Sequence, residues 1–269
     1  MRKVNYIKPL QPYMVLVSEN YQRVDENRLG ISHCYQMDLS QNMDSEVDAV
    51  PDGCIDLVFC IDDGKVSTSI GGTVLKAKHW ELGHGGTCFG IRFMPGSGVM
   101  PKELSPDMLV NQDIEIDGNI FGDNLVEKLS EQENMSRRAE IFMNVYETLI
   151  HDNEETGLKK RIEEYIRNRV CQNAGQINMS ELAQETGYSE CYLRRVFKEY
   201  NGISPKQFAQ YIRFQNLLTI LKNSDTSNEN LALDCGYYDE AHMMKEFRNY
   251  AGMTIEKYKK IITPKKDLL

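Results

Sequence analysis

Apolar and polar residues alternate with a period of two in the first half of the chain. In the clearest run, Cys54–Asp62, the side chains of Ile55, Leu57, Phe59 and Ile61 occupy alternate positions. This spacing is typical of a strand with one buried face. The same pattern covers Cys88–Met94, and weaker runs lie at Met14–Ser18, Cys34–Leu39, Val66–Val74 and Ile114–Asp117. Many short strands, separated by turns rich in Gly, Pro and Asp, predict an antiparallel β barrel or sandwich.

The period changes to that of a helix after about residue 120. Two helices are expected at 121–130 and 136–151, and the chain from Leu158 onward has helical spacing throughout. The polar stretch 153–157 ends in glycine and separates the two patterns. The sequence therefore predicts an α+β protein, divided into an N-terminal domain at 1–152, a linker at 153–157, an all-α domain at 158–262 and a tail at 263–269.

The all-α region contains an internal repeat. A Leu-Ala pair followed by Gly-Tyr occurs in Leu182–Tyr188 and again in Leu231–Tyr237, and one residue is inserted in the second turn. Because further landmarks match at an offset of 50 residues, a repeated motif is favoured over a generic helical bundle. The matching pairs are Leu193 and Met243, Phe197 and Phe247, Gly202 and Gly252, Ser204 and Thr254, Phe208 and Tyr258.

Each copy predicts two short helices joined by a glycine turn. The glycine ends the first helix in the left-handed conformation, and Ser189 or Asp239 begins the second as its N-cap. Such a helix-turn-helix places its second helix in the major groove of DNA. A helix over Ser204–Lys222 joins the copies and spans about 28 Å at 1.5 Å per residue. The two second helices are therefore expected about one DNA turn apart.

The residues of this repeat resemble the DNA-binding domain of the AraC/XylS family of bacterial transcription regulators. The resemblance rests on MSELAQETGYSECYLRRVFKEYNGISPKQF and on LALDCGYYDEAHMMKEFRNYAGMTIEKY. It covers about 158–262 and implies seven helices. More weakly, PDGCIDLVF and GIRFMPG resemble an N-terminal domain attached to some members. In better-known members, a cupin-like sensory or dimerisation domain occupies that position and a helical pair follows it.

Matching positions in the two second helices are assigned to DNA contact by this resemblance. Arg194 and Arg195 are expected to read bases, because a guanidinium donates two hydrogen bonds to guanine, and Lys198 is expected to face phosphate. The alternative for each is a solvated charged face. The second copy has few usual base readers, so mainly phosphate contacts are expected there. It also departs from the family in having Ile255 where a proline is usual. The full set is Glu190, Cys191, Arg194, Arg195, Lys198, Glu240, Ala241, Met244 and Lys245.

The charge of the chain is unevenly distributed. The 269 residues have a net charge of −9, which by itself argues against nucleic acid as a partner. Residues 1–154 hold 13 Lys and Arg against 25 Asp and Glu, a net charge of −12, whereas residues 155–269 hold 18 against 15, a net charge of +3. The acidic half is therefore expected to point away from DNA, and the salt sensitivity of binding is expected to be strong.

The first half offers little candidate chemistry. Asp56 and Arg92 lie opposite the apolar faces of their strands, and Arg92 is a candidate contact for an anionic effector; the alternative is an Arg–Asp pair on the sheet. His79, His84 and Cys88 have a loose metal-like spacing, for which a structural role is favoured over a metal site. The seven cysteines include no CxxC pair, so reduced thiols are expected.

These observations predict a sequence-specific DNA-binding regulator rather than an enzyme, with no cofactor. The resemblance implies activation of transcription, with double-stranded DNA and RNA polymerase as partners. The N-terminal domain is expected to bind a small-molecule effector or to form a homodimer; the alternative is a protein-interaction module. An Ada-like DNA-repair methyltransferase fusion would need patterned cysteine ligands that this sequence lacks. Without a signal-peptide core or a long apolar run, a cytoplasmic, nucleoid-associated protein without a membrane partner is expected.

Overall fold

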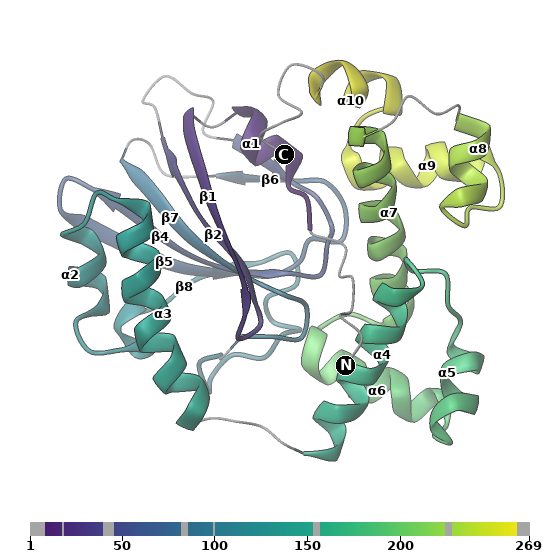
Figure 1. Cartoon of the computed structure of the whole chain (residues 1–269), viewed down its shortest axis with the longest axis horizontal. Coiled ribbons are helices and arrows are strands. Elements are labelled where there is room, and N and C mark those ends of the chain that lie inside the picture. Colours follow the sequence, from purple (N-terminus) through teal and green to yellow (C-terminus); the bar gives the residue numbers. More distant parts are fainter. Residues whose placement is uncertain are drawn as a thin grey trace.

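The chain forms three layers. The structure is a computed structural model that describes residues 9–17, 19–39, 46–81, 86–98, 100–152, 157–223 and 228–262. Figure 1 shows the layers from left to right as a pair of helices, a β-sheet and a larger helical region. The sheet belongs to the first half of the chain and the large helical region to the second half, as the change of period predicts.

The central layer is an antiparallel sheet of six strands. Its strand order is β1-β2-β7-β4-β5-β8, and β3 and β6 form a separate two-stranded ribbon. The two strands predicted most clearly are confirmed as β4 and β7, which pair at the centre of the sheet. The strands are β1 Glu19–Arg28, β2 Ile31–Asp38, β3 Glu46–Ala49, β4 Ile55–Asp62, β5 Lys65–Gly71, β6 Lys78–Glu81, β7 Thr87–Phe93 and β8 Asp113–Glu115.

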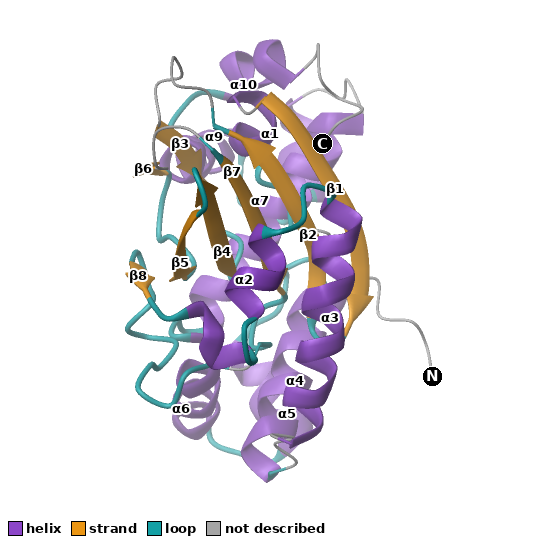
Figure 2. Ribbon diagram, turned by 90° about the vertical axis from the view of Figure 1, so that its left-hand side faces the viewer, coloured by secondary structure: helices purple, strands orange, loops and turns teal. Residues whose placement is uncertain are grey.

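One face of the sheet builds an apolar core with the first helical layer. Leu57, Phe59 and Ile91 are fully buried there, against the rings of Phe142 and Tyr146. Figure 2 shows the helices of this layer, α2 and α3, lying across the face of the sheet. The alternation of the strands therefore sends every second side chain into this core. The elements of the layer are the 3-10 turn η1 Gly118–Phe121, α2 Leu125–Ser130 and α3 Met135–Asp152.

The second half of the chain folds around a central helix, α7. Its described residues form the seven helices that the family resemblance implies. Phe208, Phe214 and Leu218 of α7 are fully buried, and Phe214 stacks edge-on against Phe247. The helices are α4 Leu158–Gln172, α5 Met179–Thr186, α6 Glu190–Asn201, α7 Pro205–Asn223, α8 Asn228–Asp234, α9 Glu240–Ala251 and α10 Ile255–Ile262.

The strand predicted at Met14–Ser18 is wrong. Residues Pro12–Val17 form a short helix, α1, instead. Proline is suited to the first position of a helix, where no backbone N–H is needed. The Tyr13 hydroxyl then donates a hydrogen bond of 2.6 Å to the carbonyl of Ala251, which ties α1 to the C-terminal region. A contact so distant in sequence overrides the local alternation.

The expectation of reduced thiols is wrong for two cysteines. Cys60 and Cys88 form a disulfide, because they are directly opposite each other on the paired strands β4 and β7. The other five cysteines are free thiols, namely Cys34, Cys54, Cys171, Cys191 and Cys235.

The two halves of the chain share one core through α7. Leu10 and Val50, both from the first half, belong to the same buried apolar cluster as the C-terminal helices. Gln215, which is only 1% exposed, accepts a hydrogen bond of 2.8 Å from the Leu10 N–H and donates to the carbonyls of Leu10 and Pro51. One side chain at the middle of α7 thus satisfies the backbone of two separate N-terminal segments.

A buried charged network forms a second connection between the halves. Glu163 of α4 is fully buried and accepts hydrogen bonds from Arg167 at 3.0 Å and from Asn201 of α6 at 3.1 Å. Lys160 lies 3.5 Å from the same carboxylate and donates to the carbonyl of Gly96 in the first half. A buried carboxylate needs such partners, because an unpaired buried charge is costly.

Replacing Gln215 by Ala is expected to lower the free energy of unfolding by about 1–3 kcal/mol, the cost of leaving a buried backbone group unsatisfied. Urea denaturation of the full chain would measure this change. Gln210→Ala, at a half-buried position of the same helix, is the matched control and should cost less. Equal effects of the two substitutions would contradict the role assigned to Gln215.

Candidate nucleic-acid interface and ligand cavity

The repeats form two helix-turn-helix units, α5–α6 and α8–α9. In each unit a glycine with positive φ follows the first helix, 73° at Gly187 and 72° at Gly236. The side chains of Ser189 and Asp239 each accept a hydrogen bond from the backbone N–H three residues ahead. The predicted turns and N-caps are therefore confirmed, and the inserted residue lengthens only the second turn.

The predicted reading face of α6 is open at its N-terminal end. Cys191, Arg194 and Arg195 are exposed, and Glu190 is half-buried. Arg194 pairs with Glu190 one helical turn before it, and the Arg195 guanidinium lies 5.3 Å from the centre of the Tyr192 ring. A base contact by Arg194 would have to replace this exposed ion pair, which costs little in water.

The C-terminal end of α6 meets a loop of the first half. A Cβ at Gly202 would overlap the carbonyl of Pro106, so the two segments are in close contact. Asp107 of this loop has a lowered pKa, chiefly through a hydrogen bond from Ser105 and also through the nearby ammonium of Lys198. Lys198 is exposed, so a phosphate could reach it, although the carboxylate of Asp107 lies nearby.

The corresponding face of α9 has fewer cationic side chains that could contact DNA. Ala241 and Lys245 are exposed, whereas Glu240 and Met244 are half-buried. The sequence reasoning missed Tyr238, which is 88% exposed and is the most exposed large apolar side chain among the described residues. It lies in the turn before α9, and the one-residue insertion in the second copy was the signal that could have found it.

The second unit is anchored to α7 by an ion pair. The guanidinium of Arg213 donates to both oxygens of Glu246, at 3.0 and 2.8 Å, and lies over the Tyr237 ring. His242 of α9 approaches the same carboxylate at 3.8 Å. The pair is mostly buried, which fixes the orientation of α9 relative to α7.

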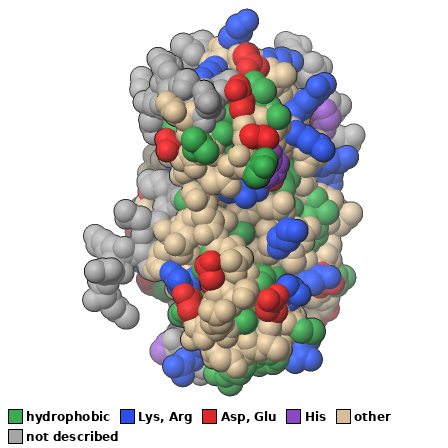
Figure 3. All heavy atoms as spheres, turned by 90° about the vertical axis from the view of Figure 1, so that its right-hand side faces the viewer, with side chains coloured by type: hydrophobic (Ala, Val, Ile, Leu, Met, Phe, Trp, Pro, Cys, Tyr) green, Lys and Arg blue, Asp and Glu red, His purple; other side chains and the backbone are tan. Residues whose placement is uncertain are grey.

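A groove of about 830 Å³ extends between the two units. Glu190 and Arg194 of α6, Lys206 and Arg213 of α7, and His242 of α9 are among its lining residues. Figure 3 views the helical region from the side opposite to the sheet, where basic side chains gather mainly on the right and acidic ones toward the centre and left. The helix that joins the units, α7, has 19 residues and is about 28 Å long. A joining helix of this length is compatible with two units in successive major grooves.

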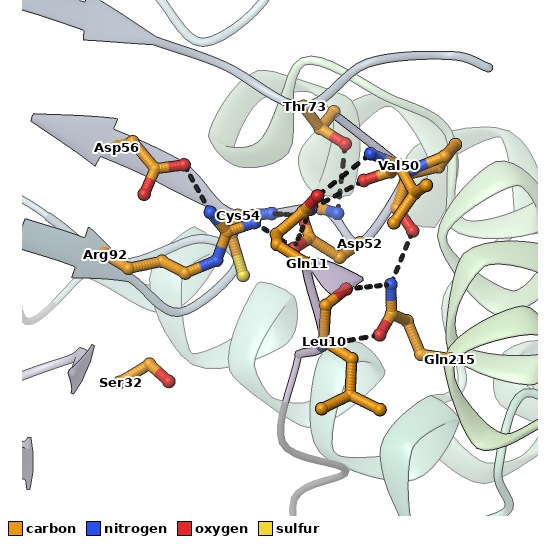
Figure 4. A network of polar contacts seen from close by, with 12 residues as sticks. Leu10, Gln11, Ser32, Val50, Asp52, Cys54, Asp56, Thr73, Arg92 and Gln215 are labelled. Carbon is orange, nitrogen blue, oxygen red and sulfur yellow. Dashed lines mark hydrogen bonds and ion pairs between the residues drawn. The ribbon is translucent and has the colours of Figure 1, made fainter. Parts of the chain in front are cut away.

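Asp56 and Arg92 lie together in the first half, at a site far from both reading helices in sequence. They are direct partners in the register of β4 and β7, and Arg92 donates hydrogen bonds to Asp56 and to Asp52 (Figure 4). Asp52 also accepts a bond of 2.9 Å from Gln11 and another from the Cys54 N–H. The Arg–Asp pair is therefore present, and the Arg92 guanidinium is already bonded to two carboxylates, those of Asp52 and Asp56.

These residues line a cavity of about 80 Å³ on the face of the sheet opposite the α3 core. Burial raises the pKa of Asp56 to about 6, although the adjacent Arg92 guanidinium acts in the opposite direction. Burial also raises the pKa of the Cys54 thiol well above its ordinary value. This cysteine therefore lines the cavity as a neutral thiol and not as a nucleophilic thiolate. The Tyr35 ring reaches the cavity by lying across Gly90, where any Cβ would overlap it.

The sequence reasoning missed Asp52, Gln11 and Tyr35 of this cavity. Asp52 and Gln11 stand in irregular segments, where no periodicity indicates the direction of a side chain.

The two candidate metal ligands that the structure describes, His79 and Cys88, each have another partner. His79 Nδ1 lies 2.6 Å from Asp48 Oδ1, Cys88 is held in the disulfide, and His84 lies outside the described residues. Among the residues that the structure describes, no group of three or more His, Cys, Asp and Glu could hold a metal ion. Nor does any described helix have the length and apolar character needed to cross a membrane.

Comparison with known proteins points to the same half of the chain. A family model described as a helix-turn-helix domain matches residues 182–261. An HTH-type transcriptional regulator of Haemophilus influenzae is 33% identical over 86 residues, 32% of this chain and 29% of that protein. The HTH-type transcriptional regulator MtrA of Neisseria gonorrhoeae is 28% identical over 101 residues, 38% of this chain and 34% of that protein. The matches thus span about a third of these relatives.

A solved structure is similar over more of the chain. The alignment with ToxT from Vibrio cholerae covers 91% of this chain and 100% of the ToxT chain, at 10% identity and a TM-score of 0.43.

Asp56 should make the stability of the protein depend on pH. Because its pKa is higher in the folded state than in the unfolded chain, protonated Asp56 stabilises the fold below about pH 4 and this contribution is lost as the pH rises through about 6. The wild type should therefore lose about 2 kcal/mol more unfolding free energy than Asp56→Asn between pH 4 and pH 7.

Urea denaturation at several pH values would measure this difference. Asp63→Asn, in the exposed turn after β4, is the matched control and should follow the wild type. Parallel pH profiles for the wild type and Asp56→Asn would count against the raised pKa.

Proposed function

Because the C-terminal part of this chain is a helix-turn-helix domain of the AraC/XylS type, we propose that the protein is a sequence-specific DNA-binding transcription regulator. One observation carries the proposal: two capped helix-turn-helix units stand at the two ends of α7, with a groove between them. A duplex lying along this groove would meet α6 in one major groove and α9 in the next.

The two units would contribute differently to recognition. Arg194 and Arg195 of α6 are exposed cations near the helix N-terminus, the part of a reading helix that contacts base edges. Lys245 is the candidate phosphate contact of α9, whose other assigned residues are acidic, apolar or half-buried. Specificity is therefore expected to come mainly from α6, and α9 to set the register.

The first half would regulate rather than bind DNA. Its charge of −12 is repelled by phosphate, and it contacts α4, α7 and the C-terminal ends of α6 and α9. We assign effector binding to the cavity that contains Asp56 and Arg92. The family resemblance further supports activation of transcription in the cytoplasm, with RNA polymerase as a partner, and a homodimer.

Arg194→Ala is expected to weaken binding to a specific operator by about 5- to 150-fold, which corresponds to the 1–3 kcal/mol of a bidentate base contact. The binding isotherm at fixed salt, on an operator selected from random DNA, measures the effect. Arg137→Ala removes an exposed, ion-paired cation from α3 in the first half and should leave the isotherm unchanged. Unchanged binding by a folded Arg194→Ala variant would refute the base contact.

Lys198→Ala should reduce the salt dependence of binding on every sequence. A lost phosphate contact lowers the slope of log K against log salt by about one. The isotherms would be repeated over a series of salt concentrations, with Lys128→Ala, an exposed lysine of α2, as the control. An unaltered slope would assign Lys198 to the contact with the first half instead.

A further inference from the structure

One aromatic side chain of the second helix-turn-helix unit lies outside the core. Tyr238 is 88% exposed, whereas Tyr237 beside it is 4% exposed and lies beneath the guanidinium of Arg213. Single exposed apolar side chains are common on protein surfaces, so the position of Tyr238 decides what its exposure means. That position is the turn between α8 and α9, on the side of the molecule away from the sheet (Figure 1).

Tyr238 is the residue that distinguishes the second turn from the first. In the first unit the N-cap of α6, Ser189, follows Tyr188 directly. In the second unit Tyr238 stands between Tyr237 and the N-cap Asp239. Both caps form in the same way, so the insertion adds an exposed phenol to this turn and leaves the start of α9 intact.

The backbone of Tyr238 is held at the N-terminal end of α9, beside the groove between the two units. Its N–H donates to Nδ1 of His242 at 3.4 Å, and His242 is one of the residues that line the groove. A reading helix directs its N-terminal residues toward base edges, so the turn before it lies along a sugar-phosphate strand at the border of the major groove. Tyrosine is among the side chains that bond phosphate oxygens in protein–DNA complexes.

The start of α9 has no lysine or arginine for a phosphate contact. Residues 239–244 include neither, and the first cation of the helix is Lys245. Both ring nitrogens of His242 face protein groups, because Nδ1 accepts from Tyr238 and Nε2 lies 3.8 Å from the Glu246 carboxylate. The phenol of Tyr238 is therefore the donor that the sequence provides at this end of the reading helix.

We propose that Tyr238 binds the DNA backbone at the start of α9: its hydroxyl donates a hydrogen bond to a phosphate oxygen, and its ring packs against the adjoining deoxyribose. The inference rests on the proposed function, and it names the side chain that anchors the second unit. A contact with sugar and phosphate carries no sequence information, so it holds α9 in register while α6 reads bases.

Two substitutions separate the hydroxyl from the ring. Tyr238→Phe is expected to weaken operator binding about 3- to 10-fold, the loss of one hydrogen bond, and Tyr238→Ala to weaken it more, because the ring contact is lost too. Isotherms of the full chain, on an operator selected from random DNA, measure both effects. The slope of log K against log salt should keep its wild-type value in Tyr238→Phe, since a neutral phenol releases no counterions.

Operators that carry one uncharged methylphosphonate at a time locate the bonded phosphate. At one position, the methylphosphonate should weaken binding of the wild type about 3- to 10-fold more than it weakens binding of Tyr238→Phe, because the variant has already lost that bond. At the other positions, wild type and variant should respond alike. Equal responses at every position would overturn the proposal.

Tyr165→Phe is the matched control. It removes the hydroxyl of another exposed tyrosine, one on α4 that is bonded to Glu185, and should bind the operator as the wild type does. Because Tyr238 is exposed, neither of its substitutions should lower the Tm, so a loss of binding is not a loss of folding.

The remaining outcomes separate this contact from the proposed function. Wild-type affinity in both Tyr238 variants refutes the contact alone. A transcription defect with intact operator binding refutes it as well, and assigns the ring to a protein partner. A wild type that binds no selected DNA refutes the proposed regulator itself, and the contact with it.

Discussion

The burial of most of α7 between the other helices and the first half of the chain is the constraint on which the rest of the structure depends. Its apolar side chains, with Phe208, Phe214 and Leu218 fully buried, form the centre of the C-terminal core. Its one buried side-chain amide, that of Gln215, donates a hydrogen bond to the backbone of the first half. A helix in this position cannot rotate to favour one neighbour without losing contacts to the others, because packed interiors leave no free volume. The spacing of the two helix-turn-helix units follows from its length.

Electrostatics explains how an acidic chain can present a surface to DNA. The excess of negative charge lies in the first half, whereas the cations of α6 and α7 face the groove. Charges beyond a Debye length, about 8 Å at physiological salt, are largely screened, so the local arrangement matters more than the total. Arg213 is neutralised by its ion pair with Glu246, which leaves Arg194 of α6 and Lys206 of α7 as exposed cations that line the groove.

The parts of the structure that could be predicted from sequence are those with local causes. The glycine turns at Gly187 and Gly236 and the caps at Ser189 and Asp239 depend on residues within one helical turn, and all of them are observed. The strand predicted at Met14–Ser18 is replaced by a short helix that Pro12 begins, and Tyr13 of this helix is bonded to Ala251, 238 residues away.

The candidate sites follow the same division between local and distant causes. Alternation placed Asp56 and Arg92 on the same face of neighbouring strands, and the register makes them partners. Asp52 and Gln11 approach them from irregular segments, and Gln215 reaches those segments from 164 residues away. Such contacts cannot be predicted from the hydrophobic periodicity of the sequence, because the direction of a side chain in a loop depends on tertiary packing alone.

The same long-range contacts determine what kind of regulation this architecture allows. The wall formed by residues 10–11 and 50–52 touches α7 at Gln215, between its two ends, rather than one helix-turn-helix unit alone. A rigid helix transmits a displacement at its middle to both ends. A change in the cavity would therefore move α6 and α9 together and alter the register of both units on DNA, instead of switching one unit off. For a ligand to shift this equilibrium, it must bind the two arrangements with different affinities.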